Sequence, residues 1–213
     1  MPLLKRITAF VFVLFCLLKT TAQLTSYKSF KLLDDNRPFK ISTLFKSNEG
    51  YIYAGTTNGL YRFDGKSFKQ INFVSPAGKD TVTAIFQDND KQVWVGFKNG
   101  KLAKKVNDKL QYFEPEEGTP KVAITSFLQD KQNNIWFATN GEGIYYFSNN
   151  HLYLINEDEG LSDKYIHALA LADNGDVLAA TDQGINICRV SSSKKTVEVI
   201  GPKNGLPDYY ITA

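Results

Sequence analysis

The stretch NNIWFATNGEGIYYF, residues Asn133 to Phe147, has a near copy in the same chain, KQVWVGFKNGKLAKKV, which begins 42 residues earlier at Lys91. Neither copy contains a recognisable catalytic motif. An internal period of this length is typical of stacked structural repeats, and it has to be tested before any single residue is interpreted.

Four such units follow one another, and a fifth begins near residue 213. They start at Ile41, Val82, Ile124, Ile166 and Ile211, so that successive starts are 41, 42, 42 and 45 residues apart. Each of the four has a bulky residue in its second apolar run, at Tyr53, Trp94, Trp136 or Leu178. Each then has a glycine, at Gly59, Gly100, Gly143 or Gly184. Three markers in constant order indicate copies of one unit.

Each unit has the pattern of four short strands. In the third unit the strand AITSFLQD is followed by the turn KQNN, the strand IWFAT, the turn NGEG, the strand IYYF and finally HLYLI. The pairs Asn58-Gly59, Asn99-Gly100, Asp64-Gly65 and Asn174-Gly175 supply the positive φ that tight hairpin turns require. No window shows a sustained helical period, so we expect an all-β chain.

The second strand decides how these hairpins pack. In IWFA the residues Ile135 and Phe137 lie on one face and Trp136 and Ala138 on the other, and all four are apolar. Both faces of the sheet must therefore be covered, which is typical of four-stranded β-propeller blades of this length. We predict blades at residues 41–81, 82–123, 124–165 and 166–210, with a fifth starting at 211–213. Trp94 and Trp136 are expected to pack between blades, although sugar-stacking platforms are an alternative.

The step between units predicts the ends of this array. The last apolar residue of each outer strand precedes the next unit by 11 positions, and Phe30 stands 11 positions before Ile41. Residues 27–40 are therefore predicted to be an orphan outer strand and its connector, with Ser26–Phe30 in the strand's place. We expect an incomplete ring, within residues 23–213, that is the N-terminal piece of a longer protein and exposes the apolar face of its last blade.

The N-terminus reads as an export signal. Residues 1–22 have a basic start, an apolar run from Ile7 to Leu18 and a small-residue end, which predicts a cleaved signal peptide. An uncleaved membrane anchor is the alternative, but a spanning helix needs about 20 apolar residues. Removal of the signal leaves 22 basic against 22 acidic side chains, and Cys188 as the remaining cysteine. A neutral exported domain is a poor candidate for nucleic-acid binding, and no intrachain disulfide is expected.

The repeats resemble the two-component regulator propeller family. The resemblance lies in LFKSNEGYIYAGTTNGLYRFDGKSF, IFQDNDKQVWVGFKNGKL and FLQDKQNNIWFATNGEGIYYF, and in the connectors NEDEGLSDKYI and GPKNGLPDYYI. Departures occur at Phe97-Lys98, Lys101-Leu102 and Leu178, where the family usually has threonine, a small apolar pair and tryptophan. The resemblance implies an extracytoplasmic sensor of Bacteroidetes type, with a membrane helix and an output domain, commonly a histidine kinase, beyond this chain.

Several polar positions are candidates for binding. Ser42, Thr83, Thr125, His167 and Thr212 stand second in their inner strands, which line the channel of a propeller. They either face a ligand or, as we favour, bond neighbouring strands and channel water. His151, equivalent to Lys109 and Ser67, is expected to be solvent-exposed.

Acidic residues form three further sets. Two lie in the connectors, at Glu114, Glu116 and Glu117 and at Glu157, Asp158 and Glu159. Paired carboxylates perform glycoside hydrolysis only at fixed separations, so catalysis is disfavoured in loops. Asp88, Asp130 and Asp173 close the inner strands, and we expect them to bond the turn backbone rather than a metal.

The preferred hypothesis is the ligand-sensing propeller segment of a periplasmic two-component receptor, anchored in the inner membrane. We expect no catalytic, cofactor or metal residues in this segment, and the ligand-binding residues are not predicted. The expected partners are a small carbohydrate, the remaining blades and signalling domains of the same protein, and possible homodimerisation, but not nucleic acid. The alternatives are a secreted propeller enzyme acting on polysaccharide and an exported protein-interaction scaffold.

Overall fold

The computed structural model describes residues 28–30, 33–34, 37–74, 80–191 and 195–208. The chain divides into two units, residues 1–31 and 32–213. In the first unit Lys28, Ser29 and Phe30 are exposed and belong to no paired strand. The predicted signal peptide lies outside the described residues. No helix among the described residues has the length and apolar character needed to cross a bilayer.

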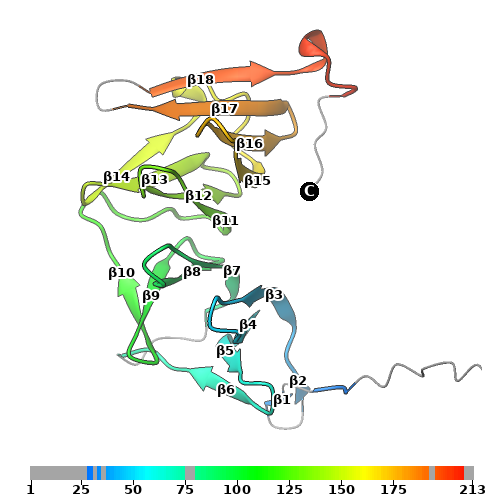
Figure 1. The fold of residues 1–213 in the computed structure, drawn as a ribbon, viewed down its shortest axis with the longest axis vertical. Coiled ribbons are helices and arrows are strands. Elements are labelled where there is room, and N and C mark those ends of the chain that lie inside the picture. Colours follow the sequence, from blue (N-terminus) through cyan, green and yellow to red (C-terminus); the bar gives the residue numbers. More distant parts are fainter. Residues whose placement is uncertain (1–27, 31–32, 35–36, 75–79, 192–194, 209–213) are drawn as a thin grey trace, which may run out of the picture. The chain divides into compact units, whose positions relative to one another are not determined.

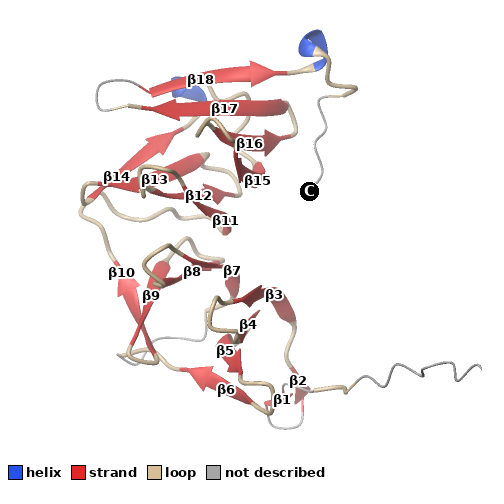
Figure 2. Cartoon of the chain, viewed as in Figure 1, coloured by secondary structure: helices blue, strands red, loops and turns tan. Residues whose placement is uncertain are grey.

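The second unit contains four sheets of four antiparallel strands each, and a small hairpin formed by β1 (Leu33–Asp34) and β2 (Arg37–Pro38) (Figures 1 and 2). The first sheet comprises β3 (Ile41–Lys46), β4 (Ile52–Thr56), β5 (Gly59–Phe63) and β6 (Phe68–Ile71). The second comprises β7 (Val82–Gln87), β8 (Val93–Phe97), β9 (Leu102–Val106) and β10 (Lys109–Phe113). The third comprises β11 (Ile124–Gln129), β12 (Ile135–Thr139), β13 (Ile144–Ser148) and β14 (His151–Ile155). The fourth comprises β15 (Ile166–Leu171), β16 (Val177–Thr181), β17 (Gly184–Val190) and β18 (Lys195–Ile200).

All four sheets have one topology. Their strands are hydrogen-bonded in chain order, and the pairing shifts register near the start of each inner strand, as between Ile124 and Ser126. The inner strands β3, β7, β11 and β15 contact one another in succession. The predicted all-β propeller fold is confirmed. Two short 3-10 turns, η1 (Glu157–Glu159) and η2 (Pro202–Asn204), are additions that the sequence pattern did not indicate.

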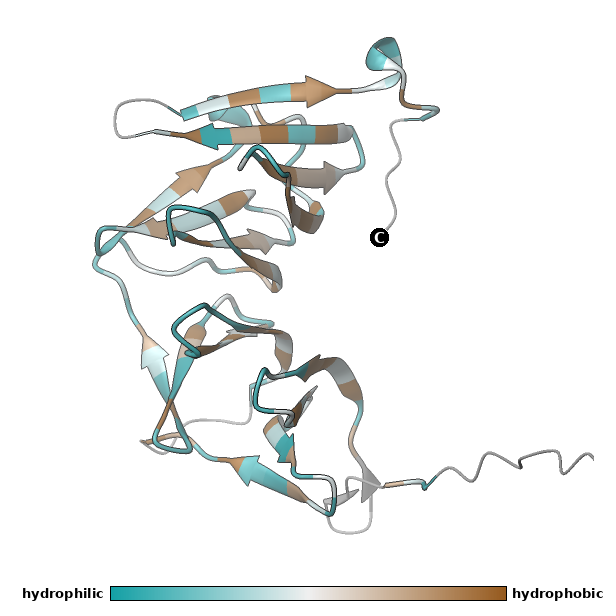
Figure 3. Cartoon of the chain, in the orientation of Figure 1, coloured by the Kyte–Doolittle hydropathy of each residue, from teal (hydrophilic) through white to brown (hydrophobic). Residues whose placement is uncertain are grey.

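Three apolar layers hold the sheets together. All residues of β8 and β12 are buried, so both faces of these second strands are covered, as predicted. Apolar residues lie mainly in the strands, and polar residues lie mainly in the turns between them (Figure 3). Trp94 is 3% and Trp136 1% exposed, which confirms their packing in the interior. Trp136 lies in a cluster with Ile166, Val177 and Cys188 of the fourth sheet.

Successive sheets also fit together through a small residue on one and a branched residue on the next. A Cβ built on Gly55 would lie 2.6 Å from Val82 Cγ1, and one built on Gly96 would lie 2.6 Å from Ile124 Cβ. Val82 and Ile124 begin β7 and β11 and are fully buried. The glycines are therefore required by the close approach of the next inner strand rather than by a turn.

An aspartate and a tryptophan form a matched pair in the second and third sheets. Trp94 Nε1 donates to Asp88 Oδ2 at 2.8 Å, and Trp136 Nε1 donates to Asp130 Oδ2 at 2.7 Å. The other carboxylate oxygen accepts a turn N–H, from Gln92 at 2.8 Å and from Asn134 at 2.9 Å. The pair thus satisfies a buried indole and closes the hairpin between the first two strands.

The fourth sheet corrects one prediction about these aspartates. Its inner hairpin is closed by the bond from Ala172 N to Asp176 O, which corresponds to the bond from Asp130 N to Asn134 O in the third sheet. Ala172 therefore occupies the position of Asp130, and Asp173 lies one residue out of register. The two sheets that lack this aspartate also lack the tryptophan, since the first has Ser47 and Tyr53 at these positions and the fourth has Ala172 and Leu178.

The two terminal sheets have an apolar face that no other described sheet covers. In the first sheet Leu44 is 62% exposed and Ile52 is exposed beside it. In the fourth, Leu178, Ile185 and Ile187 are half-buried while the alternate residues of β16 are buried. Ile211 and Thr212, where a fifth inner strand was predicted, lie outside the described residues.

Replacing Asp130 by alanine should lower the free energy of unfolding by about 1–3 kcal/mol, because the Trp136 indole N–H is left buried without its acceptor. Urea or thermal unfolding measures the change. Asp173→Ala is the matched control and should stay within about 0.5 kcal/mol of the parent, as exposed surface changes do. Equal effects of the two substitutions would contradict the assignment of Asp130.

Replacing Gly96 by alanine should also destabilise the fold, by about 1–3 kcal/mol, because the new Cβ meets Ile124 Cβ. The sign is the informative result, since glycine to alanine in an unconstrained strand stabilises by about 0.5–1 kcal/mol. A higher melting temperature for Gly96→Ala would mean that the close fit between the second and third sheets does not exist.

Candidate functional site

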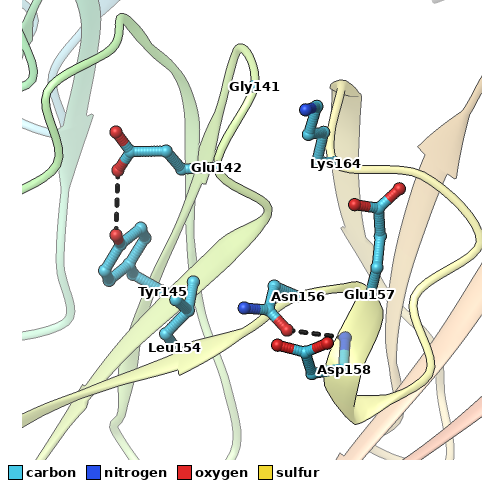
Figure 4. A pocket seen from close by; sticks show the side chains of 8 residues that line it. All are labelled: Gly141, Glu142, Tyr145, Leu154, Asn156, Glu157, Asp158 and Lys164. Carbon is cyan, nitrogen blue, oxygen red and sulfur yellow. Dashed lines mark hydrogen bonds between the residues drawn. The ribbon is translucent and has the colours of Figure 1, made fainter.

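A cleft of about 270 Å³ opens at the edge of the third sheet (Figure 4). It lies between the turn that joins β12 to β13 and the connector that leads from β14 to the fourth sheet. We refer to it as the loop-face cleft, and its lining residues are Gly141, Glu142, Tyr145, Leu154, Asn156, Glu157, Asp158 and Lys164.

The turn that carries Glu142 is held by a threonine. Thr139 Oγ1 donates to the Gly143 carbonyl at 2.7 Å and accepts the Glu142 N–H at 3.1 Å. Gly143 has a φ of 90°, and a Cβ there would lie 2.5 Å from the Ile155 carbonyl oxygen. Thr56 and Thr181 make the same bonds in the first and fourth sheets. The turn is therefore a rigid element of the repeat, and its exposed residues can vary.

Glu142 is itself fixed on the wall of the cleft. Its Oε2 accepts the Tyr145 hydroxyl at 3.0 Å, and its Oε1 accepts the Lys121 N–H at 3.1 Å. Burial and the neighbouring Glu142 carboxylate both raise the pKa of Tyr145 above its ordinary value. The phenol therefore stays protonated and donates to Glu142 throughout the neutral range.

The opposite wall is built by the connector. Asn156 caps η1, since its Oδ1 accepts the Asp158 N–H at 2.8 Å and its N–H donates to Glu159 Oε2 at 3.0 Å. Glu159 also meets Lys195 of the fourth sheet at 3.3 Å. Glu157 and Asp158 line the cleft, so two of the three acids predicted as a cluster reach it and the third is used in capping.

The charges around the cleft are unequal. Three acidic residues, Glu142, Glu157 and Asp158, line it with one basic residue, Lys164, and the Glu142 carboxylate is directed at Tyr145. Such a site favours a ligand that carries positive charge or several hydroxyl donors, because carboxylates only accept hydrogen bonds when ionised.

The predicted polar ring has a structural role at its described positions. Ser42 donates to the carbonyls of Gly55 and Val82, Thr83 to Gly96 at 3.2 Å, and Thr125 to Ile166 at 3.1 Å. These hydroxyls join neighbouring strands, which is the interpretation that we favoured from the sequence. His167 Nε2 lies 2.6 Å from Asp182 Oδ1 at a partly exposed position, and Thr212 lies outside the described residues.

The remaining candidates are not brought together. His151 is exposed, as expected, and its Nδ1 lies 2.8 Å from Glu117 Oε1. No group of histidine, cysteine or acidic side chains able to hold a metal ion occurs in the described part of the chain. Cys188 is a buried free thiol whose pKa is raised to about 12 by desolvation, so it is not a reactive nucleophile.

Sequence reasoning missed Glu142, Tyr145 and Lys164 as members of one site. The length of the turn between the second and third strands gave no signal, because three residues lie between the bonded pair Phe97 and Lys101 in the second sheet and between Thr139 and Gly143 in the third.

Comparison with known proteins gives one family and several related folds. The model of the two component regulator propeller family matches residues 118–141, which contain Asp130 and Trp136. No curated protein matches the chain.

Two similar solved structures are extracellular domains of putative hybrid two-component systems from B. thetaiotaomicron. The first has a TM-score of 0.69 and 24% sequence identity over 88% of this chain. The second has a TM-score of 0.64 and 19% sequence identity over 81% of this chain. The chain spans only 26% and 22% of these two proteins. A virginiamycin B lyase from Staphylococcus aureus is similar at a TM-score of 0.61 and 14% identity, over 81% of this chain and 59% of its own. All three likenesses concern the fold. Residues 118–141 are thus a repeat of the two-component regulator propeller family, and the chain that carries them is a β-propeller segment.

Proposed function

We propose that this chain is the extracytoplasmic, ligand-sensing propeller segment of a two-component signalling receptor. The match of a regulator propeller repeat supports the proposal, as does the likeness of fold to extracellular domains of hybrid two-component systems. The output, which we expect to be a histidine kinase, and an inner-membrane anchor would lie in other parts of the protein. The segment itself would work in the periplasm after loss of the signal peptide.

The loop-face cleft is the observation that carries a sensing role. Its walls are the turn that carries Glu142 in the third sheet and the connector, which is bonded to both sheets. Gly143 N donates to the Lys164 carbonyl at 3.0 Å, which attaches the connector to that turn. Ser162 N donates to Asn186 Oδ1 at 2.9 Å, and the Ser162 and Thr181 hydroxyls lie 3.1 Å apart. A ligand held by both walls would favour one arrangement of the third and fourth sheets over others, which is how binding energy shifts a conformational equilibrium.

The ligand that we propose is a small carbohydrate that bears an amino group or several hydroxyl donors. The excess of carboxylates in the cleft supports this choice, and its volume of about 270 Å³ suits one or two sugar units better than a long chain. The partners would be further blades of the same protein, covering the exposed faces at Leu44 and Leu178, and the downstream signalling domains. Homodimerisation of the receptor belongs to the same proposal.

The test is a thermal-shift screen of the whole exported region with neutral, acidic and amino oligosaccharides, followed by titration of any compound that binds. A bound ligand raises the melting temperature through mass action. Glu142→Ala should weaken the binding of an active amino oligosaccharide at least about tenfold, since it removes an ionic hydrogen-bond acceptor. The control is Gln183→Ala at the corresponding turn position of the fourth sheet, which should bind as the parent does. Absence of any shift across the panel would contradict carbohydrate sensing.

A further inference from the structure

The third sheet carries an aromatic row that crosses three of its strands. Trp136 pairs with Tyr146, and Tyr146 pairs with Tyr153, so the three side chains lie on one face of β12, β13 and β14. The Trp136 and Tyr146 rings stack with centroids 4.9 Å apart, and the Tyr146 and Tyr153 rings also stack at 4.9 Å, with planes 14° apart. The row therefore continues from the interior to the outer strand.

The repeat does not require this row. The corresponding positions are Tyr53, Arg62 and Lys69 in the first sheet, Trp94, Lys104 and Gln111 in the second, and Leu178, Ile187 and Glu198 in the fourth. In the second sheet the Lys104 ammonium lies 4.2 Å from the centre of the Trp94 ring and covers it. In the third sheet a tyrosine stands in place of that lysine, and a second tyrosine follows it outward.

The outermost ring is open to solvent. Exposure rises along the row, from 1% at Trp136 and 4% at Tyr146 to 38% at Tyr153. One face of the Tyr153 ring is stacked on Tyr146. The His151 ring also lies edge-on to Tyr153, with centroids 6.3 Å apart, and the exposed part of the tyrosine presents an apolar ring surface with a polar hydroxyl at its tip.

A cleft of about 380 Å³ adjoins this ring, and we refer to it as the outer cleft. Besides the two tyrosines it is lined by the amides of Gln132, Asn134 and Asn149, the hydroxyl of Ser148, and Val190 from the fourth sheet. Asn134 Nδ2 donates to Asp130 Oδ2 at 2.7 Å, which fixes the orientation of that amide. The described residues that line the outer cleft include no charged side chain.

We propose that the outer cleft binds a neutral saccharide. The apolar C–H face of a pyranose ring would stack on Tyr153, and its hydroxyls would exchange hydrogen bonds with amides that both donate and accept. None of the described lining residues is charged, which disfavours sugar acids and amino sugars, because an ion beside them would lose water without gaining a counter-charge. The volume lies in the lower part of the range for ligand pockets and suits a ligand of one or two rings. This site does not depend on the loop-face cleft or on a role in signalling.

The first arm of the test titrates the full chain with α- and β-linked glucose disaccharides, followed by saturation-transfer NMR and by the fluorescence of Trp136, which stacks on the same row. We expect a dissociation constant on the order of 1 mM for at least one of them. Tyr153→Ala and Gln132→Ala should each weaken binding, the former at least about tenfold. Tyr153→Phe should bind within about twofold of the parent, because the ring is kept. No binding of either disaccharide, or unchanged binding by Tyr153→Ala, would overturn the proposal.

The second arm separates the outer cleft from the other site. Lys69→Ala changes the exposed residue that corresponds to Tyr153 in the first sheet, and it should leave disaccharide binding unchanged. Glu142→Ala should also leave it unchanged. If Glu142→Ala abolishes disaccharide binding while Tyr153→Ala does not, the outer cleft is excluded and the loop-face cleft is the saccharide site.

Discussion

A strand whose side chains are apolar on both faces must be covered on both faces, and this constraint determines the rest of the structure. β8 and β12 meet it completely, because each lies in a sheet with another sheet on either side. The backbones of neighbouring sheets approach closely where a small residue of one sheet packs against a branched residue of the next, as Gly96 packs against Ile124. Each sheet is thus incomplete alone, and its stability depends on its neighbours, as in other repeat proteins.

The strands of each sheet are fixed by packing, whereas the residues of the loops can vary between repeats. Thr139, Thr56 and Thr181 each bond the turn between the second and third strands of their sheets, so the exposed residues of these turns can vary without loosening the sheet. The third unit departs from its neighbours through the aromatic row that ends at Tyr153. Both candidate clefts adjoin this unit. Function in a repeat protein is expected where one copy departs from the pattern that packing imposes.

The spacing of apolar residues was sufficient to predict the strands, their order and the burial of Trp136, because these follow from the period and from hydrophobicity. The assignment of Asp173 was wrong by one residue, because the matching position is defined by a backbone bond at Ala172 rather than by residue type. The loop-face cleft could not be predicted, since Glu142 and Lys164 lie on separate loops that only the packed sheets bring together. The bonds of Thr125 depend on a register shift near the start of β11 that no sequence pattern marks.

Native-state hydrogen exchange, followed strand by strand, tests most directly whether mutual coverage of the sheets sustains the fold. The backbone amides of β8 and β12 should exchange most slowly, because their sheets are covered on both sides. Those of β4 and β16 should exchange faster, because Ile52 and Leu178 lie on faces that no other described sheet covers. Equal protection of all four second strands, or slower exchange in β4 and β16, would contradict this account.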